Sequence, residues 1–336
     1  MDVLIEAEKL TKIYPGGVLA VDHIDLSVKE GEIFGFLGPN GAGKTSTIMM
    51  LVTLSHPTEG RALIAGWDVV HDRGRVRSVL GYVSQDIAVD EYLTGWENTL
   101  LQGKLYHLSL PEIKNRGREV LEMVDLWERK DDLVQTYSGG MRKRLDIACG
   151  LIHRPRILFL DEPTLGLDIQ TRSRIWEYIR RLRSEHNMTI FLTTHYMDEA
   201  DKLCERIAII DRGKLMALGT PLELKHSVGG DLVTIQFAEN GNENKEKVIP
   251  TIRQLPFVES VKEKDSQLLI VTKDGNTSIP LILSRLHDID TEVASISMKR
   301  PSLDDVFLFY TGRQLRDEEA SAQDFYRMRR AIRRAR

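Results

Sequence analysis

The sequence predicts an α/β fold whose centre is a parallel β-sheet. Four short apolar runs each precede a helical pattern: IFGFL before Gly38, RILFLD at Arg156, MTIFLTTH at Met188 and ERIAIID at Glu205. Strands that are apolar along their whole length are typical of a sheet that helices cover on both faces. Their alternation with helices therefore predicts a parallel core sheet.

Two further regions depart from this pattern. About the first thirty residues alternate apolar and polar side chains, from Val3 to Val28, with turns at PGG and KEGE. This alternation predicts an antiparallel β region. Between Thr94 and Gly150 the apolar residues instead follow helical spacing, which predicts a helical insertion.

The last third of the chain predicts a small α+β domain. After a break from Pro221 to Gly230, strand-like and helical stretches follow in the order βαββαβ. Ser302 and Asp305 then form a capping-box-like start of a helix, and its apolar stripe needs an element to pack against. The expected boundaries are 1–226 for the first domain, with the insertion at about 94–150, 230–313 for the second, and 314–336 for a basic tail.

The composition excludes several classes of protein. With 336 residues, 42% of them hydrophobic, the chain can bury a core, and its net charge of -4 gives no reason to expect a nucleic-acid partner. No run of about 18 uncharged apolar residues occurs, so we expect any membrane crossing to come from another chain. Cys149 and Cys204 lack metal-ligand spacing and are expected to be buried thiols in a reducing compartment.

GPNGAGKT, from Gly38 to Thr45, follows an apolar strand and opens a helix, as a phosphate-binding loop does. Lys44 is expected to reach the β- and γ-phosphates of ATP, and Thr45 to ligate Mg²⁺. A glycine-rich turn that only ends a strand is the alternative, and the Lys-Thr pair disfavours it. The residues expected to hold the nucleotide here are Gly38, Pro39, Asn40, Gly41, Ala42, Gly43, Lys44, Thr45 and Ser46.

RILFLDEP ends in two acids at the carboxyl end of a predicted strand, where ligands bind in parallel sheets. Asp161 fits a ligand of Mg²⁺. Glu162 points the other way and fits the residue that polarises a water in line with the γ-phosphate. Two acids that only cap a helix are the weaker alternative, because the phosphate loop is present.

A second glycine-rich helix start occurs in YSGGMRKRLD, where Ser138, Gly139 and Gly140 leave backbone N–H groups free for an anion. One phosphate loop holds a nucleotide from one side only, so this start must face another nucleotide or the far side of the same one. SGGMRKRLDIACGL, just before RILFLDEPTLGLD, resembles the signature motif of ATP-binding cassette (ABC) proteins. In that family the signature closes over ATP held by a second copy, so the resemblance implies a head-to-tail dimer.

Other marks of the ABC family stand in the expected order, and the resemblance covers about the first 226 residues. It implies that Tyr14 stacks on adenine, that Gln85 senses Mg²⁺ and the attacking water, and that His195 contacts the γ-phosphate. It also implies that Leu167 and Asp168 meet their counterparts across the dimer, and that Asp168 is among the residues that bind the nucleotide. Taken singly, Tyr14 is better explained as a core aromatic, Gln85 as a surface amide and His195 as a satisfied histidine at a strand end. In sequence order with the two strong motifs, the functional role is favoured for each.

The signature departs from the commonest form, Leu-Ser-Gly-Gly-Gln, at Tyr137 and Met141. Met141 cannot donate the hydrogen bond of a Gln amide, while Ser138 and the backbone N–H groups remain for the anion. YSGGM together with PSLDDVFLFYTGR, from Pro301 to Arg313, resembles ATPase subunits of drug exporters of the daunorubicin-resistance type. That branch pairs two ATPase copies with separately encoded membrane subunits.

Together these features predict an ATP-hydrolysing subunit at the cytoplasmic face of the membrane, which powers efflux of a drug-like or lipophilic compound through a separate permease. DIAVDEYLTGW, from Asp86 to Trp96, is the expected docking surface for that permease, with local packing of the insertion as an equal alternative. A non-transport ABC ATPase acting on nucleic acid or the ribosome is the alternative function. The chain has neither a long coiled-coil insertion nor a second cassette, which disfavours it. A third hypothesis is a nucleotide-binding regulator that does not hydrolyse ATP, and the presence of both Glu162 and His195 disfavours it.

Overall fold

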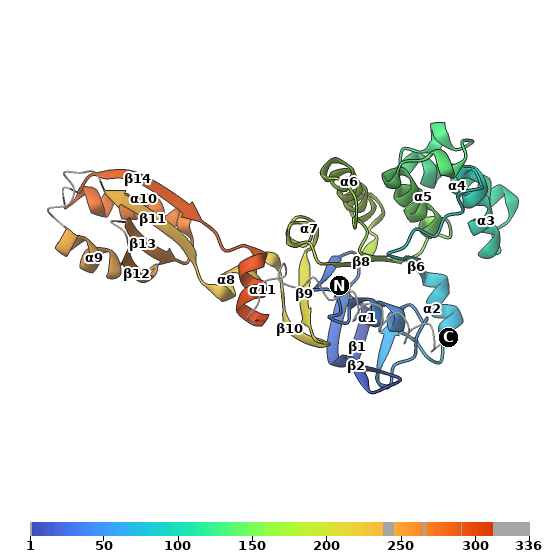
Figure 1. Cartoon of the computed structure of the whole chain (residues 1–336), viewed down its shortest axis with the longest axis horizontal. Helices are drawn as coiled ribbons and strands as arrows, with labels where there is room; N and C mark the ends of the chain where they lie inside the picture. Colours follow the sequence, from blue (N-terminus) through green and yellow to red (C-terminus); the bar gives the residue numbers. More distant parts are fainter. Residues whose placement is uncertain (1, 238–244, 265–266, 290, 312–336) are drawn as a thin grey trace. The chain divides into compact units, whose positions relative to one another are not determined.

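The computed structural model describes residues 2–237, 245–264, 267–289 and 291–311 (Figure 1). The chain divides into two compact units, Met1–Leu218 and Gly219–Gln314, and each unit has its own sheets and hydrophobic core. The basic tail expected at 314–336 lies outside the described residues. Among the described residues, no helix combines the length and the apolar character needed to cross a bilayer.

The first unit contains a six-stranded sheet in the order β10-β9-β3-β8-β7-β6. Its strands are β3 (Ile33–Leu37), β6 (Leu80–Val83), β7 (Ile157–Asp161), β8 (Thr189–Thr194), β9 (Arg206–Asp211) and β10 (Lys214–Gly219). The five strands other than β10 pair in parallel with one another. Every residue of β3, β7 and β8 is buried, as their continuous apolar sequences predict.

The parallel register brings distant segments to one edge of this sheet. Leu37 of β3 lies opposite Thr194 of β8, and Asp161 of β7 lies opposite Thr193. Since parallel strands end at the same edge, the segments after β3, β6, β7 and β8 meet there. These segments contain the predicted phosphate loop, glutamine, acid pair and histidine.

A cluster of phenylalanine rings packs between neighbouring central strands. Phe191 of β8 lies 5.5 Å from Phe34 and 5.6 Å from Phe36 of β3, and 5.3 Å from Phe159 of β7, between ring centroids. Aromatic contacts at these separations stabilise a core beyond the area that they bury. The cluster therefore fixes the three strands whose carboxyl ends carry the predicted site.

Two groups of helices complete the parallel part of the first unit. Those connecting its strands are α1 (Lys44–Leu51), α2 (Arg73–Val79), α6 (Ile169–His186) and α7 (Met197–Leu203). The insertion contains α3 (Gly95–Leu105), α4 (Leu110–Met123) and α5 (Gly139–Leu151), with 3-10 turns at Trp127–Arg129 and Val134–Thr136. Capping boxes formed by Thr94 with Glu97 and by Ser109 with Glu112 start α3 and α4.

A second, antiparallel sheet lies in the first unit, in the order β2-β1-β4-β5. It consists of β1 (Val3–Tyr14), β2 (Val18–Lys29), β4 (Glu59–Ile64) and β5 (Trp67–Asp68). The antiparallel region expected for the first thirty residues is confirmed. The short β4 and β5 were not predicted, because their sequences are too brief to show alternation.

The second unit has the predicted βαββαβ order. Its elements are β11 (Asp231–Phe237), α9 (Lys245–Arg253), β12 (Val258–Lys264), β13 (Gln267–Thr272), α10 (Gly275–His287) and β14 (Val293–Lys299), with sheet order β12-β13-β11-β14. Two more helices, α8 (Pro221–Val228) and α11 (Leu303–Thr311), pack together, and Tyr310 donates a hydrogen bond of 3.0 Å to Ser227. The final helix thus has the packing partner that its apolar stripe required, and the predicted fold class is confirmed.

Candidate active site

The loop between β3 and α1 requires glycine at two positions. A Cβ atom on Gly38 would meet the Ile210 carbonyl oxygen at 2.3 Å, and one on Gly43 would meet the Ala20 carbonyl oxygen at 2.4 Å. Gly43 also has φ of 108°, in the left-handed region that other residues avoid. Because Gly43 starts α1 without a capping side chain, the N–H groups of the first turn remain available to an anion.

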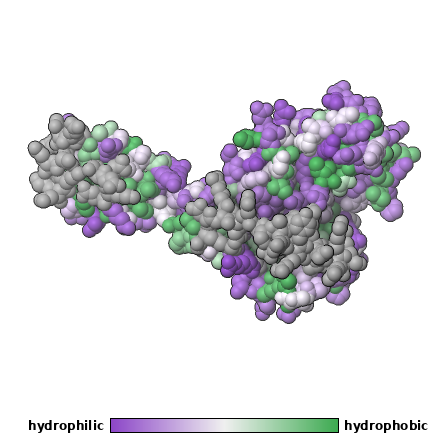
Figure 2. Space-filling model, in the orientation of Figure 1, coloured by the Kyte–Doolittle hydropathy of each residue, from purple (hydrophilic) through white to green (hydrophobic). Residues whose placement is uncertain are grey.

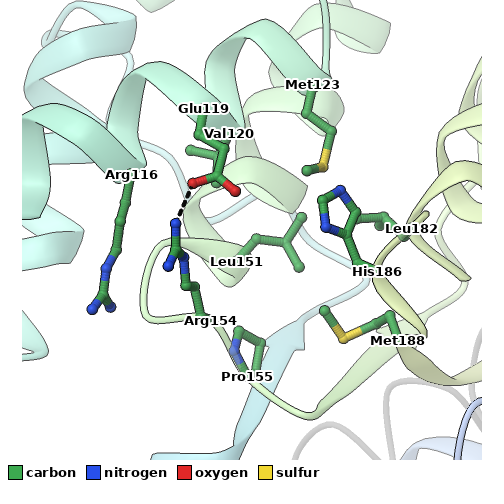
Figure 3. A pocket seen from close by; sticks show the side chains of 10 residues that line it. All are labelled: Arg116, Glu119, Val120, Met123, Leu151, Arg154, Pro155, Leu182, His186 and Met188. Carbon is green, nitrogen blue, oxygen red and sulfur yellow. Dashed lines mark hydrogen bonds and ion pairs between the residues drawn. The ribbon is translucent and has the colours of Figure 1, made fainter.

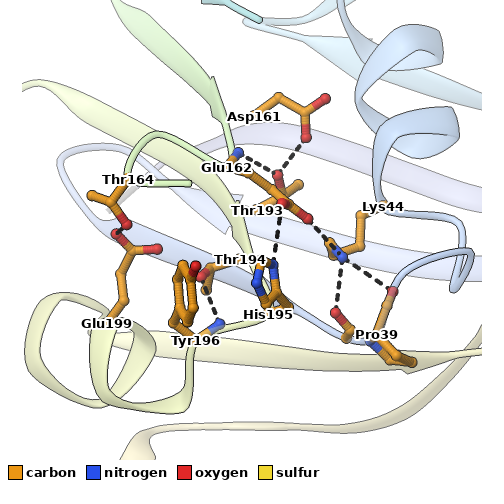
Figure 4. Close-up of polar contacts among 11 residues, drawn as sticks. Pro39, Lys44, Asp161, Glu162, Thr164, Thr193, Thr194, His195, Tyr196 and Glu199 are labelled. Carbon is orange, nitrogen blue, oxygen red and sulfur yellow. Dashed lines mark hydrogen bonds and ion pairs between the residues drawn. The ribbon is translucent and has the colours of Figure 1, made fainter. Parts of the chain in front are cut away.

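Lys44, the first residue of α1, is buried at the centre of the site, with 5% of its surface exposed. Its Nζ donates to the carbonyl oxygens of Gly38 at 2.8 Å and Pro39 at 3.1 Å. The same Nζ lies 3.0 Å from Oε1 of Glu162 (Figure 4). The loop that carries Lys44 and the strand end that carries Glu162 are therefore joined by a buried ion pair.

Glu162 contacts a second predicted residue through its other oxygen. Its Oε2 lies 3.1 Å from Nδ1 of His195, so one carboxylate joins the segments after β3, β7 and β8 (Figure 4). Burial raises the pKa of Glu162, but the His195 hydrogen bond and the Lys44 charge outweigh it and lower the pKa to about 2. Glu162 also has φ of 48°, a left-handed conformation that non-glycine residues adopt at cost and that is common at functional sites.

Asp161 lies beside the phosphate loop with 1% of its surface exposed. Thr193 Oγ1 donates to Asp161 Oδ1 at 2.5 Å, and the Thr45 hydroxyl also hydrogen-bonds the Asp161 carboxylate. Burial raises the pKa of Asp161, because the charged form is desolvated. A carboxylate and a hydroxyl at this point are hard oxygen ligands of the kind that Mg²⁺ takes together with substrate phosphates.

The described residues contain no group of three or more His, Cys, Asp and Glu side chains that could hold a metal ion without such phosphates. The hydroxyl of Thr45 and the carboxylate of Asp161 lie within hydrogen-bond distance of each other, and two such oxygen ligands fit Mg²⁺ whose remaining ligands come from a nucleotide.

Tyr14 and Gln85 differ in burial and in their contacts with the phosphate loop. Tyr14 is 5% exposed and its hydroxyl donates to Ser46 Oγ at 3.2 Å, which places the ring against the first turn of α1. The ring is at the site, but its faces are covered in this structure, so stacking on adenine stays a prediction. Gln85 is exposed in the segment between β6 and α3, and its role also stays a prediction.

The second helix start is formed as expected, at the first residues of α5. Ser138 caps α5 by accepting a hydrogen bond of 3.3 Å from the Met141 N–H, and Ser138 and Gly139 are exposed. Among the described residues, no hydrogen bond or ion pair joins Ser138–Gly140 to the loop Gly38–Ser46. The two helix starts predicted to bind anions are therefore not joined by a polar contact within the described part of one copy.

Asp168 and Leu167 lie next to this second start. Asp168 caps α6 by accepting from the N–H groups of Gln170 and Thr171, each at 3.0 Å. Leu167 Cδ2 lies 3.9 Å from the position of a Cβ atom on Gly139. Helix capping accounts for Asp168 in this structure, and its contact to a nucleotide stays a prediction.

Three further groups of polar residues, which the motifs did not identify, hold the site together. Thr193 donates to Asp161 and accepts from the Glu162 N–H at 3.0 Å. The sequence signal that could have identified it is its position as a polar residue within the apolar run MTIFLTTH. Glu199 is fully buried and accepts from Thr164 Oγ1 at 2.8 Å, which joins α7 to the segment after Glu162 (Figure 4). The third group consists of Lys143 and Asp146 on α5, which are both buried.

A cavity of about 460 Å³ lies between α4 and the ends of α5 and α6, and none of the predicted site residues lines it (Figure 3). Its apolar wall includes Val120, Leu151 and Leu182. An ion pair between Glu119 and Arg154, 2.6 Å apart, crosses its rim. The cavity is therefore separate from the converging residues at the edge of the sheet.

Comparisons with known proteins agree with this geometry. Residues 21–165 match the family model described as "ABC transporter", and residues 219–311 match "ATP-binding protein DrrA1-3-like, C-terminal domain". The chain is 42% identical to the daunorubicin resistance ATP-binding protein DrrA2 of Streptomyces coeruleorubidus, over 94% of this chain and 97% of the relative. It is 38% identical to the linearmycin resistance ATP-binding protein LnrL of Bacillus subtilis, over 94% of this chain and 100% of the relative.

Solved structures are similar to the first unit. The cbiO1 protein of Clostridium perfringens, part of an ABC transporter complex, has a TM-score of 0.63 and 27% identity and covers 68% of this chain and 94% of its own. The ATP-binding cassette MJ0796, in a dimeric state bound to ADP and Pi, has a TM-score of 0.58 and 28% identity. That match covers 64% of this chain and 98% of the cassette.

Proposed function

The chain belongs to the ABC transporter family of ATP-binding proteins and is an ATPase, and from this premise we propose that it powers a drug exporter. In this proposal two copies bind two ATP and drive efflux of a drug-like compound through a separate membrane subunit, at the cytoplasmic face of the membrane. The main structural support for ATP hydrolysis is the buried junction at which Glu162 contacts Lys44 at 3.0 Å and His195 at 3.1 Å. Relatives named for resistance to daunorubicin and linearmycin support the substrate class.

The residues of the junction divide the chemistry among them. Lys44 and the N–H groups of α1 hold the phosphates of ATP. When ATP is bound, the Lys44 ammonium group pairs with a phosphate as well as with Glu162. Glu162 is a carboxylate with its pKa near 2, and it accepts the proton of the attacking water while His195 holds it in position. General base assistance of this kind contributes ~10²–10⁴-fold in rate. Asp161 and Thr45 are the ligands proposed for Mg²⁺, which neutralises phosphate charge when bound.

We propose that the exposed start of α5 completes the site of a second copy. Ser138 and Gly139 are exposed and touch no part of their own phosphate loop through a hydrogen bond or ion pair in the described structure. A helix start attracts an anion through its N–H groups and its dipole. In a dimer whose two copies face opposite ways, the γ-phosphate held by one copy would lie at the start of α5 of the other copy. The dimeric state of the related cassette MJ0796 supports this arrangement.

The proposed docking site for the membrane subunit centres on Tyr92. Its side chain is 84% exposed between the glutamine segment and α3, and Ile87 and Leu101 nearby in sequence are 42% and 45% exposed. Figure 2 shows hydrophobic groups among hydrophilic ones over the helical insertion. Trp96, in contrast, packs inside the insertion at 6.2 Å from Trp127 between ring centroids, so local packing accounts for that residue.

Purification from membranes in mild detergent tests the proposed partner. We expect the wild-type chain to bring a membrane protein with several spanning helices, and Tyr92→Arg to lose it, because the arginine places an uncompensated charge in an apolar contact. Leu222→Arg on α8, where the leucine is 63% exposed, is the matched control and should retain the partner. Recovery of ribosomes or nucleic acid in place of a membrane protein would support the alternative function and contradict export.

A further inference from the structure

We propose that Lys143 and Asp146 of α5 are positioning residues that clamp the segment carrying Gln85 onto the helix capped by Ser138. Through this clamp Gln85, which is predicted to sense the Mg²⁺ and water of a copy's own ATP, would move together with the helix start proposed to face the partner's ATP. The proposal rests on the shared-site dimer proposed above. It concerns the coupling between the two sites and not the formation of either one.

Lys143 reaches across from α5 to the segment after β6. Its side chain is buried, with 3% of the residue exposed, and its Nζ donates to the Ser84 carbonyl oxygen at 2.6 Å. Ser84 directly precedes Gln85 in the chain. A buried ammonium group is costly unless it is hydrogen-bonded and paired, so this contact fixes the backbone beside Gln85.

Asp146 holds the same segment on the other side of Gln85. It lies one helical turn after Lys143, is 6% exposed, and accepts a hydrogen bond from the backbone N–H of Ala88. Its Oδ2 lies 3.8 Å from Lys143 Nζ and has no hydrogen-bond partner of its own among the described residues. Gln85 is therefore bracketed between two backbone positions, Ser84 and Ala88, that α5 holds with opposite charges.

The energetics of the pair favour a geometric role. Burial raises the pKa of Asp146 to about 6 and lowers the pKa of Lys143, so desolvation acts against both charges. A buried ion pair adds little net stability compared with apolar residues of similar volume, whereas loss of one partner strands a buried charge. Such a pair is suited to fixing how two segments lie against each other.

Neighbouring contacts tie the rest of the segment to the helical insertion. Arg142 of α5 pairs with Glu91 and donates to the carbonyl oxygen of Gln135 at 3.0 Å. Asn98 of α3 accepts from the Asp90 N–H at 2.8 Å and donates to the Asp90 carbonyl oxygen at 2.9 Å. The segment that carries Gln85 thus continues directly from β6 of the parallel sheet, and side chains of α3 and α5 bind it to the helical insertion. It therefore connects the parallel sheet with the insertion.

Lys143→Met tests the clamp, because methionine keeps the apolar stem and removes the charge. We expect kcat for ATP hydrolysis to fall about tenfold, and ATP-driven dimerisation in a Glu162→Gln background to weaken about tenfold, the loss of one hydrogen bond to a charged group. The Kd of a single chain for ATP should not change, since Lys44 and the phosphate loop are untouched. Lys143→Arg should restore kcat, and Lys114→Met, which replaces an exposed lysine of α4, is the matched control.

Asp146→Asn provides a second route, because the amide oxygen still accepts from Ala88 while the charge that faces Lys143 is gone. It should lower kcat and dimerisation in the same direction, with the ATP Kd unchanged. The proposal is overturned if both variants match Lys114→Met, or if the ATP Kd of the single chain weakens in parallel with kcat. A Glu162→Gln parent that fails to dimerise with ATP overturns the shared-site dimer as well, whereas failure of the clamp alone leaves that parent dimer intact.

Discussion

Glu162→Gln is expected to lower kcat by ~10²–10⁴-fold, because an amide cannot accept the proton of the attacking water. Glutamine keeps the size of the side chain and an oxygen for the Lys44 contact, so ATP binding should remain. ATP that is bound and not hydrolysed should hold two copies together. Steady-state hydrolysis, nucleotide binding and size-exclusion chromatography with ATP measure the three effects.

Glu177→Gln is the matched control for this variant. Glu177 is an exposed glutamate of α6, and its amide should leave hydrolysis at the wild-type rate. A Glu162→Gln protein that hydrolyses ATP as fast as the control would show that this carboxylate is not the base. Loss of ATP binding together with hydrolysis would instead assign Glu162 to the fold of the phosphate loop.

Ser138→Arg is expected to lower turnover by about 10²-fold or more, since stabilising donors at a reacting phosphate contribute on this scale. The arginine removes the hydroxyl that caps α5 and fills the exposed helix start with a large side chain. Binding of ATP to a single chain should stay at the wild-type Kd, because that binding uses the phosphate loop. Hydrolysis rates and a fluorescent ATP analogue separate the two results.

Loss of a helix cap alone costs about 1 kcal/mol, so its effect must be separated from the effect at the anion site. Ser109 caps α4 in the same way, with its Oγ accepting from the Glu112 N–H. Ser109→Arg should therefore lose a similar amount of stability and keep its ATPase activity. Equal loss of activity in both arginine variants would contradict a role of Ser138 at a shared site.

The convergence of Lys44, Asp161, Glu162 and His195 was predictable from the sequence, because each lies at the carboxyl end of an apolar strand or shortly after it. Parallel strands bring such ends to one edge without any knowledge of side-chain contacts. The sequence motifs also identified the helix start at Ser138, whose residues suit an anion wherever the helix lies.

Other parts of the site depend on packing that local patterns do not record. Lys143 and Asp146 read as ordinary polar residues on a helix, and only the tertiary structure shows that both are buried against Ser84 and Ala88. The covered ring of Tyr14 is a further case, since alternation along β1 identifies the face of the strand but not what packs on it.

Specific ATPase activity as a function of protein concentration tests the shared site most directly. If each pocket needs the exposed helix start of a second copy, the rate per chain should fall steeply as dilution separates the copies, while each monomer still binds ATP. Fast hydrolysis per chain in dilute protein, shown by light scattering to be monomeric, would contradict the account.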